Sequence, residues 1–205
     1  MRRFAPRQGQ RHLSGLWWSA TAGGHVGFES WLERDLLLAL DFDTTVVAIA
    51  SLPFWLSWSD DTGQAVRHAR GLLRAPGGRV RGRGGLPASG TAPAARRREV
   101  RRDSEACESL GWEYRLLGAP APVVTANLRW LAGYRHPRHR LPAAAAALMG
   151  VFAAPRSLMV AAEQVDDPVE VLPVLYHLLW WQELVADLCA PLRARTVVRV
   201  EDGQR

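Results

Sequence analysis

The sequence predicts an α/β fold, with a helix and strands in its first half and a mainly helical second half. An amphipathic helical pattern covers residues 28–40, β-branched and aromatic runs follow at 44–59, and apolar positions return at helical spacing between 123 and 189. The 205 residues are 48% hydrophobic and include nine Trp. That suffices for one domain, or for a core domain of about 120 residues with a smaller one behind it.

The pattern FESWLERDLLLAL, residues 28–40, predicts the first helix. Its large apolar residues recur at helical spacing: Leu32, Leu36, Leu37 and Leu40. Ser30, with Glu33 three residues later, fits a capping box. In this motif the side chain of each residue accepts a hydrogen bond from the backbone N–H of the other. We therefore expect the helix to start near Ser30, after a turn at Gly23-Gly24.

Strands are predicted on both sides of a long polar tract. The run TTVVAIASLPFWLSWS, residues 44–59, predicts one or two strands with a break at Pro53, followed by a turn at 60–63 and a hairpin partner. A charged, helix-like stretch through Glu105 and the run WEYRLLG, residues 112–118, predict a helix and then a short strand.

Residues 70–98 differ from the sequence on either side. They contain seven Gly, eight Arg and three Pro, and neither an acidic nor an aromatic residue. Ordering them would cost roughly 1–2 kcal/mol per residue, whereas burying their four larger apolar side chains would return about 1.5–3 kcal/mol each. This balance predicts that residues 70–98 are disordered.

The C-terminal part, residues 123–205, is predicted to be helical and winged-helix-like, behind a first domain at 1–122. Helices are expected at 123–134, after Pro142, and twice within 157–189 with a junction at Asp166-Asp167-Pro168. A closing strand is expected at TVVRVE. Helix, turn, helix and strand is the order of a winged-helix module, a common scaffold for binding DNA or a partner.

The charge balance favours a polyanionic partner. The net charge is +6 and the pI about 10.5, so nucleic acid is the first candidate; the alternative is that the excess sits in one unstructured stretch. No apolar run approaches the roughly 20 residues that cross a bilayer, and the N-terminus lacks the apolar core of a secretory signal. We expect no membrane partner, a cytoplasmic location, and buried thiols at Cys107 and Cys189.

Several segments resemble one protein family. GFESWLERDLLLALDFDTTVVAIASLPFWL, followed by ACESLGWEYRLLG, is similar to the N-terminal domain of TnsA-like endonuclease subunits of heteromeric transposases, and TANLRWLAGYRHPRH and VLPVLYHLLWWQEL also resemble members of this family. The resemblance implies a restriction-endonuclease-like mixed sheet flanked by helices, disrupted here in its middle, before a helical, winged-helix-like C-terminal part. It also implies metal-dependent cleavage at transposon 5′ ends, with a DDE-type transposase similar to TnsB acting on the 3′ ends.

The resemblance implies three active-site groups: a helix Glu, a strand Asp, and an acid or Gln two residues before a Lys or its substitute. Carboxylates and carbonyl oxygens are the ligands of Mg²⁺, which activates water and offsets charge on the phosphate. By this resemblance Glu33 is the catalytic helix carboxylate and a Mg²⁺ ligand, and Glu29, one turn away on the same face, is a second ligand. The alternative is that Glu33 serves only the capping box.

The strand groups are missing after His68, where the family has them. All 26 basic residues are Arg, and the chain has one Ile and one Asn, which indicates a GC-rich gene. Read one base later, GC-rich codons for residues 71–73 encode Asp-Phe-Phe, and those for 82–87 encode Val-Val-Val-Asp-Cys-Arg. Two compensating single-base changes, or two sequencing errors, would thus have removed the missing groups, and the chain as written is expected to be catalytically defective. The alternative is a natural Arg/Gly-rich loop that binds nucleic acid.

A basic loop in the C-terminal part is the predicted DNA-phosphate contact, with a solvated loop as the alternative. It comprises Arg135, His136, Arg138, His139 and Arg140. His177 is predicted to be a core residue, and Trp180 and Trp181 to be helix core or a partner surface. The rival functions are a non-catalytic DNA-binding or transposase-docking protein and a free-standing winged-helix regulator.

Overall fold

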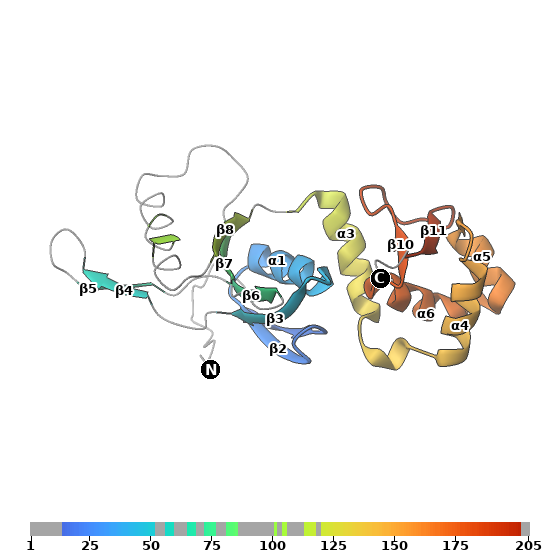
Figure 1. The fold of residues 1–205 in the computed structure, drawn as a ribbon, viewed down its shortest axis with the longest axis horizontal. Coiled ribbons are helices and arrows are strands. Elements are labelled where there is room, and N and C mark those ends of the chain that lie inside the picture. Colours follow the sequence, from blue (N-terminus) through green and yellow to red (C-terminus); the bar gives the residue numbers. More distant parts are fainter. Residues whose placement is uncertain are drawn as a thin grey trace. The chain divides into compact units, whose positions relative to one another are not determined.

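The computed structural model describes residues 14–51, 56–59, 65–68, 72–76, 81–85, 101, 104–105, 113–117 and 120–201. The chain is a mixed α/β protein that divides into two compact units, Met1–Ala119 and Pro120–Arg205 (Figure 1). The boundary expected from sequence, after residue 122, falls at the first residue of helix α3 (Pro122–Leu131). The first unit holds the candidate catalytic helix, and the second holds the basic loop.

The first unit is built around helix α1 (Trp31–Phe42), which starts after the N-cap residue Ser30, as the capping box predicts. It packs on an antiparallel hairpin of β1 (Gly15–Ser19) and β2 (Gly24–Phe28). The sequence analysis found the Gly23-Gly24 turn but not these strands; Gly23 has a φ of +59°, which glycine adopts without strain. The shared core contains Val26, Phe28, Leu36, Leu37, Leu40, Val46 and Ile49.

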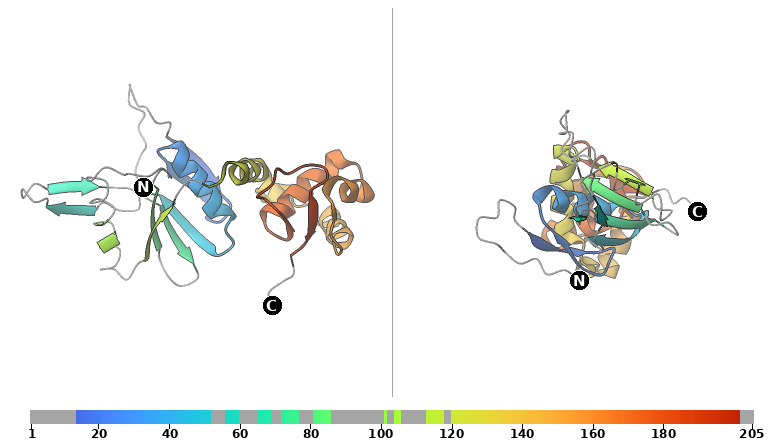
Figure 2. Two further views of the ribbon diagram at one scale, coloured as in Figure 1. Left: turned by 90° about the horizontal axis from the view of Figure 1, so that it is seen from above. Right: turned by 90° about the vertical axis from the view of Figure 1, so that its left-hand side faces the viewer.

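A four-stranded mixed sheet follows in the same unit. Its order is β3 (Val46–Ser51), β6 (Leu72–Pro76), β7 (Arg81–Gly85) and β8 (Glu113–Leu117). Strand β6 pairs antiparallel with both β3 and β7, whereas β8 is parallel to β7. Helix α1 contacts β3 and β7, so the start of the helix belongs to the same unit as this sheet (Figures 1 and 2).

The prediction of disorder for residues 70–98 is wrong for the ten residues of β6 and β7. The free-energy comparison made from sequence included only the burial of side chains on the favourable side. Paired strands also satisfy the backbone donors and acceptors of β6 and β7 along β3 and β8, which that balance left out. The remaining residues of 70–98 lie outside the described part of the chain.

The expected hairpin partner is present nearby. Strand β4 (Leu56–Ser59) pairs antiparallel with β5 (Ala65–His68), and the predicted break at Pro53 and turn at 60–63 lie outside the described residues. Arg101, Ser104 and Glu105 are helical, in agreement with the charged helix-like stretch expected there.

Asp41 ties the β1–β2 hairpin to the end of α1. Its side chain is 6% exposed and accepts four hydrogen bonds. The donors are Trp17 Nε1 (3.0 Å), Ser19 Oγ (2.7 Å), Ala20 N (3.1 Å) and Thr21 N (2.9 Å). A buried carboxylate is tolerated only when its oxygens are satisfied in this way.

The second unit is mainly helical. After α3 come two 3₁₀ turns, η1 (Ala132–Tyr134) and η2 (Pro137–His139), and then α4 (Pro142–Val151), α5 (Leu158–Val165) and α6 (Pro168–Trp180). The junction at Asp166-Asp167-Pro168 lies between α5 and α6 as expected, where Asp167 Oδ1 caps the helix by accepting from Val169 N at 2.9 Å. The core includes Leu131, Leu148, Phe152, Leu158, Leu175, Leu178 and Trp180.

A small antiparallel sheet closes this unit. Strands β9 (Arg156–Ser157), β10 (Leu184–Ala186) and β11 (Val197–Val200) pair in the order β10-β11-β9. The expectation of helix up to residue 189 is wrong after Trp180, because Gln182 adopts a φ of +57°, which ends the helix and turns the chain into β10. No helix in the described residues is long and apolar enough to cross a membrane.

Candidate functional site

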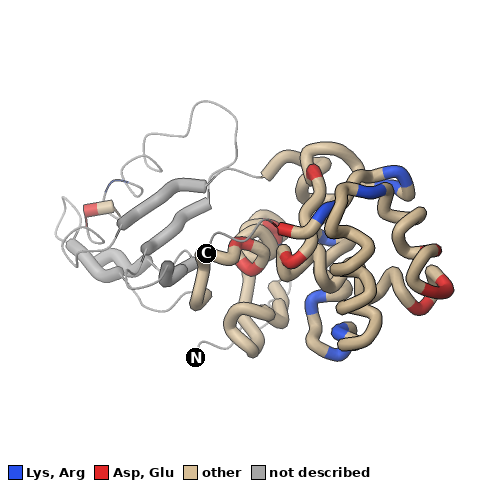
Figure 3. The backbone as a smooth tube through the Cα atoms, turned by 45° about the vertical axis from the view of Figure 1, so that its right-hand side comes forward, with Lys and Arg blue, Asp and Glu red and all other residues tan. Residues whose placement is uncertain are grey.

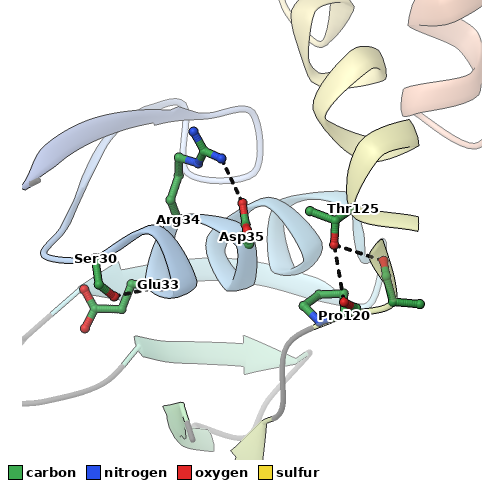
Figure 4. Close-up of polar contacts among 7 residues, drawn as sticks. Ser30, Glu33, Arg34, Asp35, Pro120 and Thr125 are labelled. Carbon is green, nitrogen blue, oxygen red and sulfur yellow. Dashed lines mark hydrogen bonds and ion pairs between the residues drawn. The ribbon is translucent and has the colours of Figure 1, made fainter. Parts of the chain in front are cut away.

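Glu33 lies in the first turn of α1, where the capping box holds its carboxylate. Ser30 Oγ accepts a hydrogen bond from Glu33 N at 3.2 Å (Figure 4). Glu33 Oε2 accepts one from the backbone N of Glu29 at 2.5 Å. The first bond satisfies a backbone donor that the start of a helix leaves without an intrahelical partner. The Ser30 half of the capping box is therefore present, whereas the Glu33 carboxylate binds the backbone N of Glu29, one residue before the N-cap.

Glu29 does not lie on the helix. It precedes the N-cap Ser30, in the connection between β2 and α1. The expectation that Glu29 sits one helical turn from Glu33 on the same face is thus wrong, because the helix begins only after residue 30. The backbone of Glu29 still meets Glu33, through the 2.5 Å hydrogen bond to its carboxylate.

The described residues do not fit a Mg²⁺ site around Glu33. Within them, no group of three or more His, Cys, Asp or Glu side chains converges as metal ligands. The neighbouring strands supply little: β3 (VVAIAS), β6 (LLRAP) and β7 (RGRGG) contain no acidic residue, and β8 contains only Glu113. Mg²⁺ requires several converging oxygen ligands, and the sequences of these strands supply one carboxylate, that of Glu113.

The basic loop at 135–140 is held by contacts within the second unit. Arg140 forms a two-pronged ion pair with Glu183, with Nη2 2.9 Å from Oε2, and this bond raises the pKa of Arg140 above its ordinary value. Arg135 donates to the backbone carbonyl of Ala132. Much of the positive charge of these two residues is thus already engaged inside the protein.

The histidines of this loop are also engaged. His136 Nδ1 caps η2 by accepting from the backbone N of Arg138 at 3.1 Å, and Arg138 Nε donates to His139 Nε2 at 3.3 Å. Partial burial, and after it the nearby positive charge of Arg138, lowers the pKa of His139, so this ring is neutral at pH 7. The loop is exposed at Arg138, and its contact with DNA stays a prediction.

His177 is a core residue, as predicted. It is 2% exposed, and its Nδ1 lies 2.8 Å from the carbonyl oxygen of Tyr134, to which the ring N–H donates. Burial lowers the pKa of His177, although the bond to Tyr134 partly offsets this. Trp180 is core at 2% exposed, whereas Trp181 is 40% exposed and donates from Nε1 to the carbonyl of Arg135 at 3.3 Å.

Four arginines that the sequence analysis did not single out gather at the small sheet of the second unit. Arg156 lies in β9, Arg199 in β11, and Arg193 and Arg195 in the loop before β11; all four are exposed. The sequence does not show that these arginines lie together, because only the pairing of β9 with β11 brings residue 156 beside residue 198. The same loop carries Cys189, which is exposed, so the prediction of a buried thiol there is wrong; Cys107 lies outside the described residues.

Compared with known proteins, the chain matches no protein-family model, and no curated protein is significantly similar to it.

Proposed function

We propose that this chain is a TnsA-like DNA endonuclease subunit of a heteromeric transposase whose cleavage site is defective in this copy. The observation that carries the proposal is the contrast between Glu33, on the first turn of α1, and the strands β6 and β7, whose sequences LLRAP and RGRGG contain no carboxylate. The resemblance implies a metal-binding Asp and a further acid on strands after this helix. With one acidic group left, Mg²⁺ has too few oxygen ligands.

The strand pairing supports the frame hypothesis. Read one base later, the coding sequence would replace Gly71 and Gly85 with Asp. Strand β6 starts at Leu72, which pairs with Arg83, and β7 runs on to Gly85, so position 85 belongs to the end of the antiparallel β6–β7 pair at which β6 begins.

For the first unit, we propose the restriction-endonuclease-like fold. Its support is the order of elements: helix α1 first, then the mixed sheet β3-β6-β7-β8 that the helix contacts.

For the second unit, we propose a winged-helix-like module. The order α4, β9, α5, α6, β10 and β11 supports it, because a strand precedes two helices and a hairpin returns to pair with that strand. Such a module serves to bind DNA or the DDE-type transposase, which would be similar to TnsB.

The direct test uses a supercoiled plasmid carrying the transposon ends. We expect the purified chain in Mg²⁺ to nick this plasmid no faster than its Glu33→Ala variant. A chain made from a gene with codons 71–87 shifted by one base restores Asp at 71 and 85, and we expect nicking that is lost again in its Glu33→Ala variant. The nucleotide sequence of codons 65–100 provides an independent check, because paired insertions and deletions should be visible there.

A second candidate is a non-catalytic DNA-binding or transposase-docking protein. It is favoured by the capping geometry of Glu33, whose carboxylate already serves the start of α1. Metal-independent binding to transposon ends or to the DDE-type partner, with no nicking by the frame-shifted chain, would support this candidate over the first.

A further inference from the structure

We propose that Arg156, Arg193, Arg195 and Arg199, named here the arginine surface, bind the phosphate backbone of duplex DNA. This inference deepens the proposed DNA function of the chain and rests on it. The surface is distinct from the basic loop at 135–140 that the sequence predicts.

Hydrogen bonds of the backbone and of two hydroxyl groups bring three of these residues to one place. Residues 193–196 form a tight turn, in which Thr196 N donates to Arg193 O at 2.9 Å and Arg193 N donates to Thr196 Oγ1 at 2.9 Å. The carbonyl of Ala194, between Arg193 and Arg195, accepts from Ser157 Oγ at 2.9 Å. Because Arg156 precedes Ser157, the backbones of all three arginines lie around this one contact.

Arg199 extends the surface along β11. Val198 pairs with Arg156 of β9, and Arg199 pairs with Val185 of β10. Val198 is fully buried, whereas Arg199 is exposed and so lies on the outer side of the strand. Arg156, as the direct partner of Val198, lies on the opposite side of the sheet from Arg199, but in the edge strand β9. The arginines therefore surround this edge of the sheet, where a long, regularly charged ligand can contact several of them.

The loop before β11 is preorganised. The buried side chain of Asn127 donates to the carbonyls of Leu188 (2.9 Å) and Ala190 (2.8 Å) and accepts from the backbone N of Leu192 at 3.1 Å. One side chain thereby fixes three backbone groups of an irregular loop. Because this loop is already ordered before DNA binds, less conformational entropy is lost on binding.

Three of the four charges are not neutralised within the described residues: Arg156, Arg193 and Arg195 form no ion pair there, in contrast to Arg140 with its Glu183. Three acidic residues, Asp166, Asp167 and Glu170, gather around the start of α6, whereas Asp187 and Glu201 lie near the arginines in the sequence; Figure 3 marks acidic positions in red and basic ones in blue. Helix α6 itself contains no Lys or Arg.

Duplex DNA is the occupant that this arrangement fits. Guanidinium groups form two-pronged hydrogen bonds with phosphate oxygens. Contacts with the sugar-phosphate backbone of DNA require no apolar pocket on the protein. Within the turn only the small Ala194 separates Arg193 from Arg195, so no bulky side chain stands between these two charges. The net charge of +6 favours the same class of partner.

The test measures binding of the full chain to a fluorescent random-sequence duplex of about 30 base pairs, roughly three helical turns, across a salt series. A random sequence suffices because backbone contacts do not depend on base identity. The test variant is Arg193→Gln with Arg195→Gln. The matched control, Arg135→Gln with Arg138→Gln, removes the same charge from the basic loop. All backbone bonds of the 193–196 turn remain, so an unchanged Tm verifies folding.

Each lost phosphate contact lowers the slope of log K against log salt by about 0.9, so we expect the test variant to lose about 1.8. At about 0.1 M salt this corresponds to roughly 10- to 60-fold weaker binding, with a smaller loss in the control. Unchanged affinity and slope in a folded test variant, while the parent chain binds, would overturn the arginine surface and leave the proposed function standing. No binding by the parent chain at low salt would overturn both.

Cys189 gives a second measurement, since it lies in the same loop and is exposed. In a Cys107→Ser background it is the only thiol of the chain. A photoactivatable group attached there should crosslink to duplex DNA, and the yield should fall in the Arg193→Gln, Arg195→Gln variant. Equal yields in the two chains would contradict the proposal.

Discussion

Ser30 and Glu33 form a capping pair at the start of α1: the Ser30 hydroxyl accepts from the backbone N of Glu33 at 3.2 Å. In return, the Glu33 carboxylate accepts from the backbone N of Glu29. The residue that the family resemblance marks as a metal ligand thus has a structural role that requires no metal. Experiments on Glu33 must therefore separate its capping role from the metal-ligand role that the resemblance implies.

The capping role predicts a stability effect at Glu33 in the absence of metal. Replacing Glu33 with Ala should destabilise the first unit by about 0.5–2 kcal/mol, the usual range for a lost helix cap. Glu33→Gln retains a side-chain acceptor and should lose less. Urea unfolding in EDTA measures both variants. Equal stability of the Ala variant and the parent would show that the cap contributes nothing.

The Asp41 network predicts a larger effect in the same unit. Asp41→Ala leaves the donors of Trp17, Ser19, Ala20 and Thr21 without their acceptor, so we expect a loss of about 3–5 kcal/mol. Asp35→Ala, which removes an acid from a part-buried ion pair with Arg34, should cost less, because it removes fewer hydrogen bonds. Thermal unfolding compares the two. Similar losses at both positions would argue against the network.

His177 predicts how the stability of the second unit depends on pH. Burial lowers its pKa in the folded state below the ordinary value of 6.5, so the unfolded chain binds the proton more readily. Stability should therefore be fully present above about pH 6.5 and be lost as the pH falls toward the lowered pKa. His177→Gln should flatten this dependence. His139→Gln is the control for the neighbouring histidine, whose pKa is lowered in the same direction.

Asn127 predicts the rigidity of the loop before β11. Asn127→Ala removes the acceptor of Leu192 N and the donors to two carbonyls, so the amide of Leu192 should exchange with solvent faster. Hydrogen exchange measures this directly. DNA binding should weaken as well if preorganisation of the arginine surface matters. Protection equal to that of the parent chain would contradict the assigned role of Asn127.

Local patterns in the sequence predicted much of the fold. The capping box placed the start of α1 at Ser30, and Pro142 and the Asp-Asp-Pro junction placed helix boundaries in the second unit. These signals act within a few residues of the chain, so no tertiary information is needed.

The features that the sequence did not predict share a different cause. Strands β6 and β7 form in a Gly- and Arg-rich tract because β3 and β8 pair with them, and the arginines at 156 and 193–199 meet because β9 pairs with β11. Both are long-range relationships that local composition does not report. For Glu33 the sequence left two interpretations open, a catalytic metal ligand and a helix-capping residue. The hydrogen bonds at the start of α1 support the capping role directly.

The central claim is that this chain keeps the helix of a nuclease without the strand carboxylates. The most direct measurement is plasmid nicking in Mg²⁺ by four proteins: the chain, the chain with codons 71–87 shifted by one base, and the Glu33→Ala variant of each. The account predicts nicking by the shifted chain only, abolished by its Glu33→Ala change. Nicking by the unshifted chain that disappears in its own Glu33→Ala variant would contradict the account.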